Sequence, residues 1–266
     1  FDRWDELCAA LRGAAPVLSK LGRVKRIKFS TTAGKYVDKE RTILDLLESL
    51  VTAATGTQHR SVLPRATDAV RMALELGAEL ADDELEMLLA LVCDFVDAFW
   101  LIPSWAPERR FTVAMYRGRY VLFLRVAQGS RGGPLTYASV AALAARCVQS
   151  LFVQPEALGS SRCAFNLAIQ LYVDDPLAIA RGTRAVIDRL FARLLAGWLV
   201  LGVPLAWHKA DVGQHVVWCG LSYHIANTFI IVTVPDDKKR ELLDLCLEAY
   251  TRQRVSRKWM MASKPV

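Results

Sequence analysis

The sequence predicts an α+β fold in which helices back an antiparallel sheet. Short apolar runs rich in β-branched and aromatic residues are separated by turn residues, a pattern typical of β-hairpins. Between these runs lie longer segments with apolar residues at helical spacing. Since 53% of the 266 residues are hydrophobic, the chain can bury a sizeable core.

The first third of the chain predicts a helix, a hairpin and a second helix. Apolar residues at helical spacing predict a helix from Trp4 to Leu21. The basic segment 24–47 favours β structure, with Thr31 to Gly34 as the tip of a hairpin. Pro64 opens an amphipathic helix that runs to Leu76, because proline is tolerated in the first helical turn.

The rest of the chain alternates strands with long helices. The expected strands and hairpins lie at 87–99, 109–126, 165–180 and 212–235, and the expected helices at 133–152, 183–202 and 236–254. The segment 212–235 holds no charged residue and is long enough to span a membrane, but its polar and β-branched residues favour a buried hairpin. We therefore expect no membrane partner.

Charge and cysteine content narrow the possible partners and compartment. The net charge is +7, and the segment from Lys20 to Arg41 holds eight basic and two acidic residues. Such a patch fits a polyanion, although a solvated basic surface is the plainer explanation. The cysteines are scattered without a C-x-x-C pair, which predicts a reducing intracellular compartment, cytoplasmic or nuclear, and no zinc site: Cys8, Cys93, Cys147, Cys163, Cys219 and Cys246.

Two carboxylates interrupt an otherwise apolar run in QLYVDDPLAIA, at Asp174 and Asp175. Burying adjacent negative charges without a partner is costly, so a cation is expected beside them. Asp94 also ends an apolar run, and one sheet could bring the three carboxylates together. Mg²⁺ or Mn²⁺ prefers such oxygen ligands, and the pattern points to phosphoryl or nucleotidyl transfer. The alternative is that the two aspartates only form a turn.

Several segments, in order along the chain, resemble the motifs of reverse transcriptases of the retrovirus and retrotransposon type. Tyr172 to Asp175 resembles the Y-x-D-D motif, and Asp94 to Phe99 resembles D-x-x-x-A-[FY]. Gln128 to Pro134 is similar to the Q-G-x-x-x-S-P loop, with Gly133 in place of serine. The remaining matches are the fingers motif at Lys39 to Asp45, Leu63-Pro64-Arg65, Lys209, and the primer-grip hairpin at Trp218 to Leu221.

The resemblance implies a catalytic role for the acidic residues. Asp94 and Asp174 would hold two Mg²⁺ ions, with Asp175 close behind, and Lys209 would protonate the leaving pyrophosphate as general acid. A solvated lysine near a turn is an equally simple explanation of Lys209.

The resemblance also implies a nucleotide-binding role for residues elsewhere. Lys39 and Arg41 would neutralise triphosphate oxygens, and Gln128 and Gly129 would let the backbone approach the incoming nucleotide. Phe99 would lie where a ribose 2′-hydroxyl would go. The alternatives are exposed cations on a hairpin for Lys39 and Arg41, and a core aromatic for Phe99.

The implied fold is a right-hand polymerase with fingers and palm and with the thumb largely absent. The expected divisions are an N-terminal helix and fingers at 1–63, a palm at 64–225 that includes fingers residues 100–135, and the end of the primer-grip hairpin with a thumb-like helix at 226–266. The implied partners are an RNA template, a DNA primer, deoxynucleoside triphosphates, and other domains or subunits that supply the thumb. The alternative function is a captured, inactive domain that serves as an RNA-binding or structural subunit.

Overall fold

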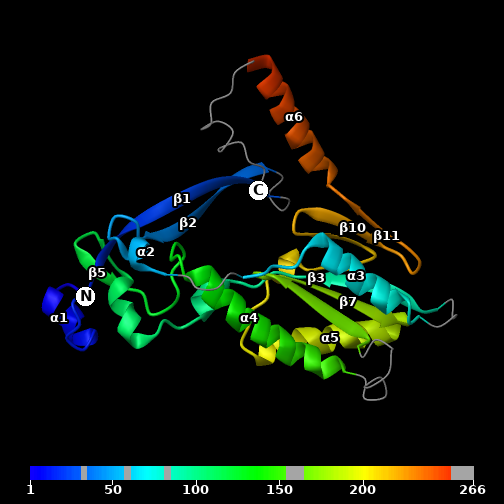
Figure 1. Ribbon diagram of the computed structural model, residues 1–266, viewed down its shortest axis with the longest axis horizontal. Helices are drawn as coiled ribbons and strands as arrows, with labels where there is room; N and C mark the ends of the chain where they lie inside the picture. Colours follow the sequence, from blue (N-terminus) through cyan, green and yellow to red (C-terminus); the bar gives the residue numbers. More distant parts are fainter. Residues whose placement is uncertain (31–34, 57–60, 81–84, 154–164, 253–266) are drawn as a thin grey trace. The chain divides into compact units, whose positions relative to one another are not determined.

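The computed structural model describes residues 1–30, 35–56, 61–80, 85–153 and 165–252, with the backbone alone at 26–30, 35–36 and 39. These residues form two compact units, 1–62 with 97–143, and 63–96 with 144–266 (Figure 1). The mixture of helices and several sheets confirms the predicted α+β class. The expectation of one antiparallel sheet is wrong, because the strands form three separate sheets and one pairing, β1 with β4, is parallel.

The first unit is built on a four-stranded sheet in the order β2-β1-β4-β5. Its elements are α1 Trp4–Ala10, β1 Leu18–Ser30, β2 Lys35–Asp45, α2 Val51–Ala54, the 3₁₀ helices η1 Ala98–Leu101 and η2 Ala106–Phe111, β4 Val113–Tyr116, β5 Arg119–Leu122 and the start of α4 Gly133–Gln149. The β4–β5 turn is the one predicted, since Arg117 and Gly118 both have positive φ. The predicted tip at 31–34 lies outside the described residues.

The N-terminal helix is shorter than the sequence predicts. It ends at Ala10, where Arg12 and Gly13 take up left-handed φ angles of 56° and 83°. Leu18 to Leu21 instead begin β1, whose strand pairs with both β2 and β4. The helical spacing of Val17 and Leu21 was therefore misleading, because pairing with distant strands outweighs local periodicity.

The second unit contains a sheet that is covered on both faces. Its strands follow the order β6-β7-β3-β8, with β3 Met87–Val92, β6 Leu167–Tyr172, β7 Asp175–Gly182 and β8 Asp211–Gly213. Helices α3 Ala66–Gly77 and α5 Arg184–Val200 both contact β3 and β7 and lie on opposite sides of them (Figure 1). This explains why β3 and β7 are continuous apolar runs rather than alternating ones.

The segment predicted as one buried hairpin is a three-stranded meander. Strands β9 His215–Trp218, β10 Leu221–Ile225 and β11 Ile230–Thr233 form a sheet of their own. One face packs with α3 and β3 in a single core, through Val216, Trp218, Tyr223 and Ile225. Two short 3₁₀ turns, η3 Ser150–Phe152 and η5 Trp207–Lys209, and helix α6 Asp236–Arg252 complete the unit.

Among the residues that the structure describes, one helical segment, Gly133–Phe152, is long and apolar enough to cross a membrane by length and composition. Core helices of soluble proteins meet the same criterion, so the segment alone carries little weight. The segment 212–235, which raised the membrane question, forms β structure instead.

Candidate active site

The predicted carboxylates lie at one end of the four-stranded sheet in the second unit. Strand β3 pairs antiparallel with β7 up to Val92 opposite Leu177. Two backbone hydrogen bonds extend this contact, from Cys93 N to the Pro176 carbonyl at 3.3 Å and from Phe95 N to the Asp174 carbonyl at 2.9 Å. Asp94 lies between these two donors, so the fold places it across from the Asp174–Asp175 turn.

Asp94 is a buried charge with a cationic partner. The residue is 9% exposed, and the Lys209 ammonium forms an ion pair with its carboxylate. The backbone positions this lysine, since Ala206 N donates to the Asp94 carbonyl at 2.8 Å and Val96 N donates to the Pro204 carbonyl at 2.9 Å. A buried carboxylate needs such compensation, and here it comes from a distant segment of the same chain.

The turn that carries the aspartate pair has an unusual backbone. Tyr172 pairs with Asp175, which leaves Val173 and Asp174 as the two turn residues. Val173 has a φ of 57°, a left-handed conformation that is costly for a β-branched side chain. Such conformations cost about 1–3 kcal/mol and concentrate at functional sites. The sequence shows the turn but not this strain.

Trp218 connects the meander to the aspartate turn. Its indole Nε1 donates a hydrogen bond to the Asp175 carbonyl at 2.9 Å, and its ring meets Tyr172 edge-on, with the ring centroids 6.3 Å apart. The side chain is fully buried, at 2% exposure. The sequence placed Trp218 in a hairpin motif, but no pattern indicated that it holds this carbonyl.

Two thiols lie within the electrostatic influence of the aspartates. Burial, reinforced by the charge of Asp175, raises the pKa of Cys93 to about 12. Partial burial of the thiol also raises the pKa of Cys219 to about 12, with further contributions from Asp175 and then Asp174, although the residue as a whole is exposed. Cys219 belongs to the turn between β9 and β10, where it and Gly220 have positive φ. Both thiols are therefore protonated at neutral pH.

The carboxylates offer the oxygen donors that a hard cation prefers, but they are not gathered into a ready metal site. Within the described part of the chain, no three His, Cys, Asp or Glu side chains are grouped so that they could hold a metal ion. In this arrangement the Lys209 ammonium binds Asp94. Mg²⁺ needs only one or two carboxylates from a protein, so oxygen donors on facing strand ends suit it.

The predicted phosphate-binding and nucleotide-binding residues lie in the first unit. Arg41 is exposed on β2, opposite Val24 of β1, and Lys39 lies on the same strand, although its side chain is outside the described residues. The Gln128 carbonyl accepts a hydrogen bond from Leu44 N at 2.8 Å. The fold therefore brings the predicted Gln-Gly loop against the strand that carries the basic residues.

Gly129 has a clear structural reason to be glycine. Its φ is 107°, and a Cβ at this position would lie 2.3 Å from the Leu44 carbonyl oxygen. Both the backbone conformation and the close approach to β2 exclude a side chain. This requirement is independent of any nucleotide.

Phe99 lies in η1 and is half-buried. Its ring stacks on Tyr137, with centroids 5.0 Å apart and an interplanar angle of 29°. The contact is typical of a packed aromatic side chain. Part of the ring is exposed, and the predicted role at a nucleotide sugar stays a prediction.

Comparison with known proteins supports the fold through solved structures, whereas no sequence comparison gives a match. No protein-family model matches the chain, and no curated protein sequence matches it. The chain is similar to a foamy viral protease–reverse transcriptase in complex with double-stranded DNA, with a TM-score of 0.53 and 17% identity over 86% of this chain and 39% of that one. A second structure, with an RNA/DNA hybrid, has a TM-score of 0.52 and 16% identity over 86% of this chain and 25% of that one.

These likenesses define the class of fold. The described structure has a reverse-transcriptase-like, polymerase-like α+β fold. The chain spans between a quarter and two fifths of each of the two structures compared.

Proposed function

We propose that this chain is the polymerase core of an RNA-directed DNA polymerase of the retroelement type. The observation that carries the proposal is Asp94 at a strand end across from the Asp174–Asp175 turn, in a polymerase-like fold. The proposed partners are an RNA template, a DNA primer and deoxynucleoside triphosphates. The solved structures with DNA and with an RNA/DNA hybrid support nucleic acid as a partner class.

In this proposal Asp94, Asp174 and Asp175 hold Mg²⁺ or Mn²⁺. When bound, the cation would stabilise negative charge on the attacking 3′-oxygen and on the leaving pyrophosphate. Asp94 is buried at a strand end and the Asp175 backbone carbonyl is held by Trp218, so the chain has little freedom to move at either position. Such fixed positions favour the alignment of reacting groups.

Lys209 and the residues of the first unit have complementary roles in the proposal. The Lys209 ammonium compensates Asp94 before the cation binds, and it is then free to donate its proton to pyrophosphate. Lys39 and Arg41 contact triphosphate oxygens, because cations on an exposed strand can bind phosphate. Gln128 and Gly129 position the incoming nucleotide, and Phe99 restricts its sugar.

A second candidate function is a catalytically inactive, RNA-binding or structural subunit. The ion pair between Lys209 and Asp94 favours it, because an internal cation satisfies the buried charge without a metal. Such a protein would keep the fold and its basic surface while losing nucleotide transfer.

Primer extension on an RNA template distinguishes the two candidates. Wild type should extend a DNA primer in Mg²⁺ or Mn²⁺, Asp174→Asn should not, and Asp188→Asn should match wild type. Asp188 is a suitable control because it is an exposed aspartate on α5, paired with Arg184. Binding of an RNA/DNA hybrid without any extension by wild type would support the inactive subunit instead.

A further inference from the structure

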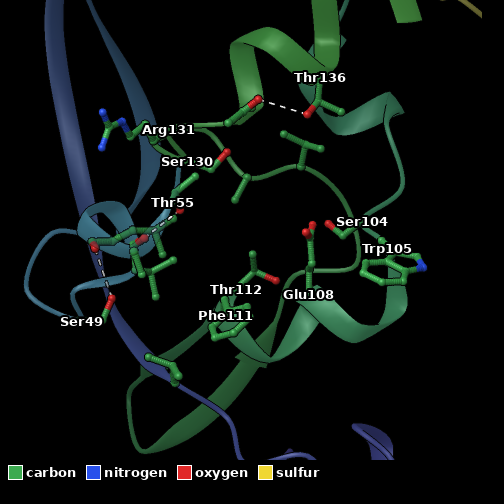
Figure 2. Close-up of a pocket in the computed structure, with 18 of the residues that line it drawn as sticks. Ser49, Thr55, Ser104, Trp105, Glu108, Phe111, Thr112, Ser130, Arg131 and Thr136 are labelled. Atoms are coloured by element: carbon green, nitrogen blue, oxygen red, sulfur yellow. Dashed lines mark hydrogen bonds between the residues drawn. The ribbon is translucent and has the colours of Figure 1, made fainter. Parts of the chain in front are cut away.

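The first unit contains a cavity that none of the proposed catalytic roles uses. It measures about 800 Å³, and all of its lining residues belong to the first unit (Figure 2). Its apolar wall comes from α2, η2, the segment before α4 and the first turn of α4, and includes Val51, Phe111, Val126, Ala127 and Leu135. The size falls within the range of sites for small organic molecules.

Three threonine hydroxyl groups around this cavity have already used their protons on backbone carbonyls. Thr55 donates to the Val51 carbonyl at 2.7 Å and Thr136 to the Gly132 carbonyl at 3.1 Å (Figure 2). The Thr112 hydroxyl lies 3.0 Å from both the Arg109 and the Phe123 carbonyls and donates to one of them. A hydroxyl has one proton and two lone pairs, so each of these groups offers only acceptor capacity to a ligand.

Glu108 adds a carboxylate to the same wall. Figure 2 shows this side chain directed into the cavity from η2. Among the described residues it has neither a hydrogen-bond nor an ion-pair partner. The neighbouring arginines are engaged elsewhere, because Arg109 donates to the Ser104 carbonyl at 3.2 Å and the Arg110 guanidinium lies over the Phe111 ring.

Arg131 is the cation among the lining residues, and it does not neutralise Glu108. Its guanidinium donates to the Thr52 carbonyl at 3.2 Å, and Figure 2 shows it pointing away from the Glu108 carboxylate. The cavity therefore presents apolar surface, hydroxyl groups and the carboxylate of Glu108, with Arg131 at a separate part of its wall.

We propose that this cavity binds a small organic cation, an amine or amidine carried on an apolar or aromatic body. The apolar wall would bury the body, and the N–H groups would donate to Glu108 and to the hydroxyl oxygens. A carboxylate or phosphate ligand beside Glu108 would meet a like charge. The site is thus distinct in chemistry from the phosphate-binding role given to Lys39 and Arg41, and it does not rest on polymerase activity.

Three probes of one shape test the proposal on the full chain: 2-naphthylmethylammonium, 2-naphthylmethanol and 2-naphthoate. Affinities are measured by calorimetry or by ligand-observed NMR. The ammonium should bind wild type about tenfold more tightly than the alcohol, as expected for a charge-assisted contact with a solvent-accessible carboxylate. The naphthoate should bind more weakly than either.

Two variants and one control locate the site. Glu108→Gln should remove the preference for the ammonium and leave the alcohol's affinity unchanged, because only the charge is lost. Glu6→Gln, an exposed glutamate on α1, should behave as wild type. Thr136→Trp, which places a bulky ring at the cavity wall, should weaken all binding.

Equal affinity for ammonium and alcohol would overturn the proposal, as would a preference that survives in Glu108→Gln. Binding that persists in Thr136→Trp, or no binding of any probe at millimolar concentration, would also overturn it. Circular dichroism of each variant confirms that it is folded.

Discussion

The indole nitrogen of Trp218 donates a hydrogen bond to the Asp175 backbone carbonyl across 2.9 Å, and so joins the meander of β9 to β11 to the aspartate turn. Trp218→Phe keeps an aromatic ring but removes this donor and some buried volume. We expect a loss of about 1–3 kcal/mol in the free energy of unfolding, measured by urea denaturation. Primer extension should fall further than this stability loss explains, because the turn is no longer fixed.

Trp198→Phe is the matched control for this change. Trp198 is also fully buried, but its Nε1 has no hydrogen-bond partner in the described structure. The same substitution should therefore cost less stability, since it removes an unsatisfied donor along with the volume. Equal costs at the two positions would show that the Trp218 hydrogen bond contributes nothing.

The ion pair between Lys209 and Asp94 predicts an asymmetric response to mutation. Lys209→Met leaves a buried carboxylate uncompensated and should cost about 1–3 kcal/mol. Asp94→Asn should cost less, because the lysine side chain is 46% exposed and can turn to water. Urea denaturation of both variants and of the double variant measures the coupling.

Millimolar Mg²⁺ should restore much of the stability of Lys209→Met if the cation takes the place of the ammonium. Lys238→Met, which breaks an exposed ion pair with Glu241, should change stability by about 0–1 kcal/mol and show no such restoration. Identical melts of Lys209→Met with and without Mg²⁺ would contradict a cation site at Asp94.

Cys219 can report on the charge of the aspartates. Burial of its thiol, with the charges of Asp175 and Asp174, raises its pKa to about 12, so alkylation at pH 8 should be slow. Mg²⁺ at fixed ionic strength should speed alkylation several-fold, because a bound cation offsets those charges. Asp175→Asn should have the same effect without metal, and site-resolved mass spectrometry measures the rates.

The same raised pKa fixes the direction of a stability change at high pH. In the unfolded chain the thiol titrates near its ordinary value of 9.0, so between 9 and 12 the folded state binds more protons. The contribution to stability is complete below pH 9 and is lost as pH rises toward 12. Cys147 and Cys246 are exposed, as Cys219 is, and lie away from the aspartate turn, so they provide internal controls for the alkylation rates.

Phe99→Val separates a role at the nucleotide sugar from simple packing. Under the proposed function, ribonucleotide incorporation should rise about tenfold or more, a relief of about 1.4 kcal/mol, while deoxynucleotide use stays within about tenfold. Loss of the stacking on Tyr137 should also lower stability.

Phe123→Val is the control for this selectivity test. Phe123 is likewise half-buried and stacks on Trp100 in the same unit, with centroids 5.7 Å apart. It should lose stability without any change in sugar selectivity. A Phe99→Val variant that behaves in the same way would identify Phe99 as a packing residue.

The sequence alone determined those helices and hairpins that depend on residues close together in the chain. Apolar runs with turn residues between them predicted the β4–β5 and β6–β7 hairpins, and helical spacing predicted α3, α4, α5 and α6. The placement of Asp94 and of Asp174–Asp175 at strand ends was also visible, because each follows or interrupts an apolar run. These features depend on neighbouring residues, which the sequence displays directly.

Only the tertiary structure decided the contacts between distant segments. Leu18 and Ser19 pair with β4, and Lys20 and Leu21 pair with β2, so this segment is strand and not part of the first helix. Lys209 reached Asp94 because the chain before it pairs with Phe95 and Val96. The link from Trp218 to Asp175 joins residues 43 positions apart. Periodicity cannot specify such partners, because their energies arise only when separate elements pack together and exclude water.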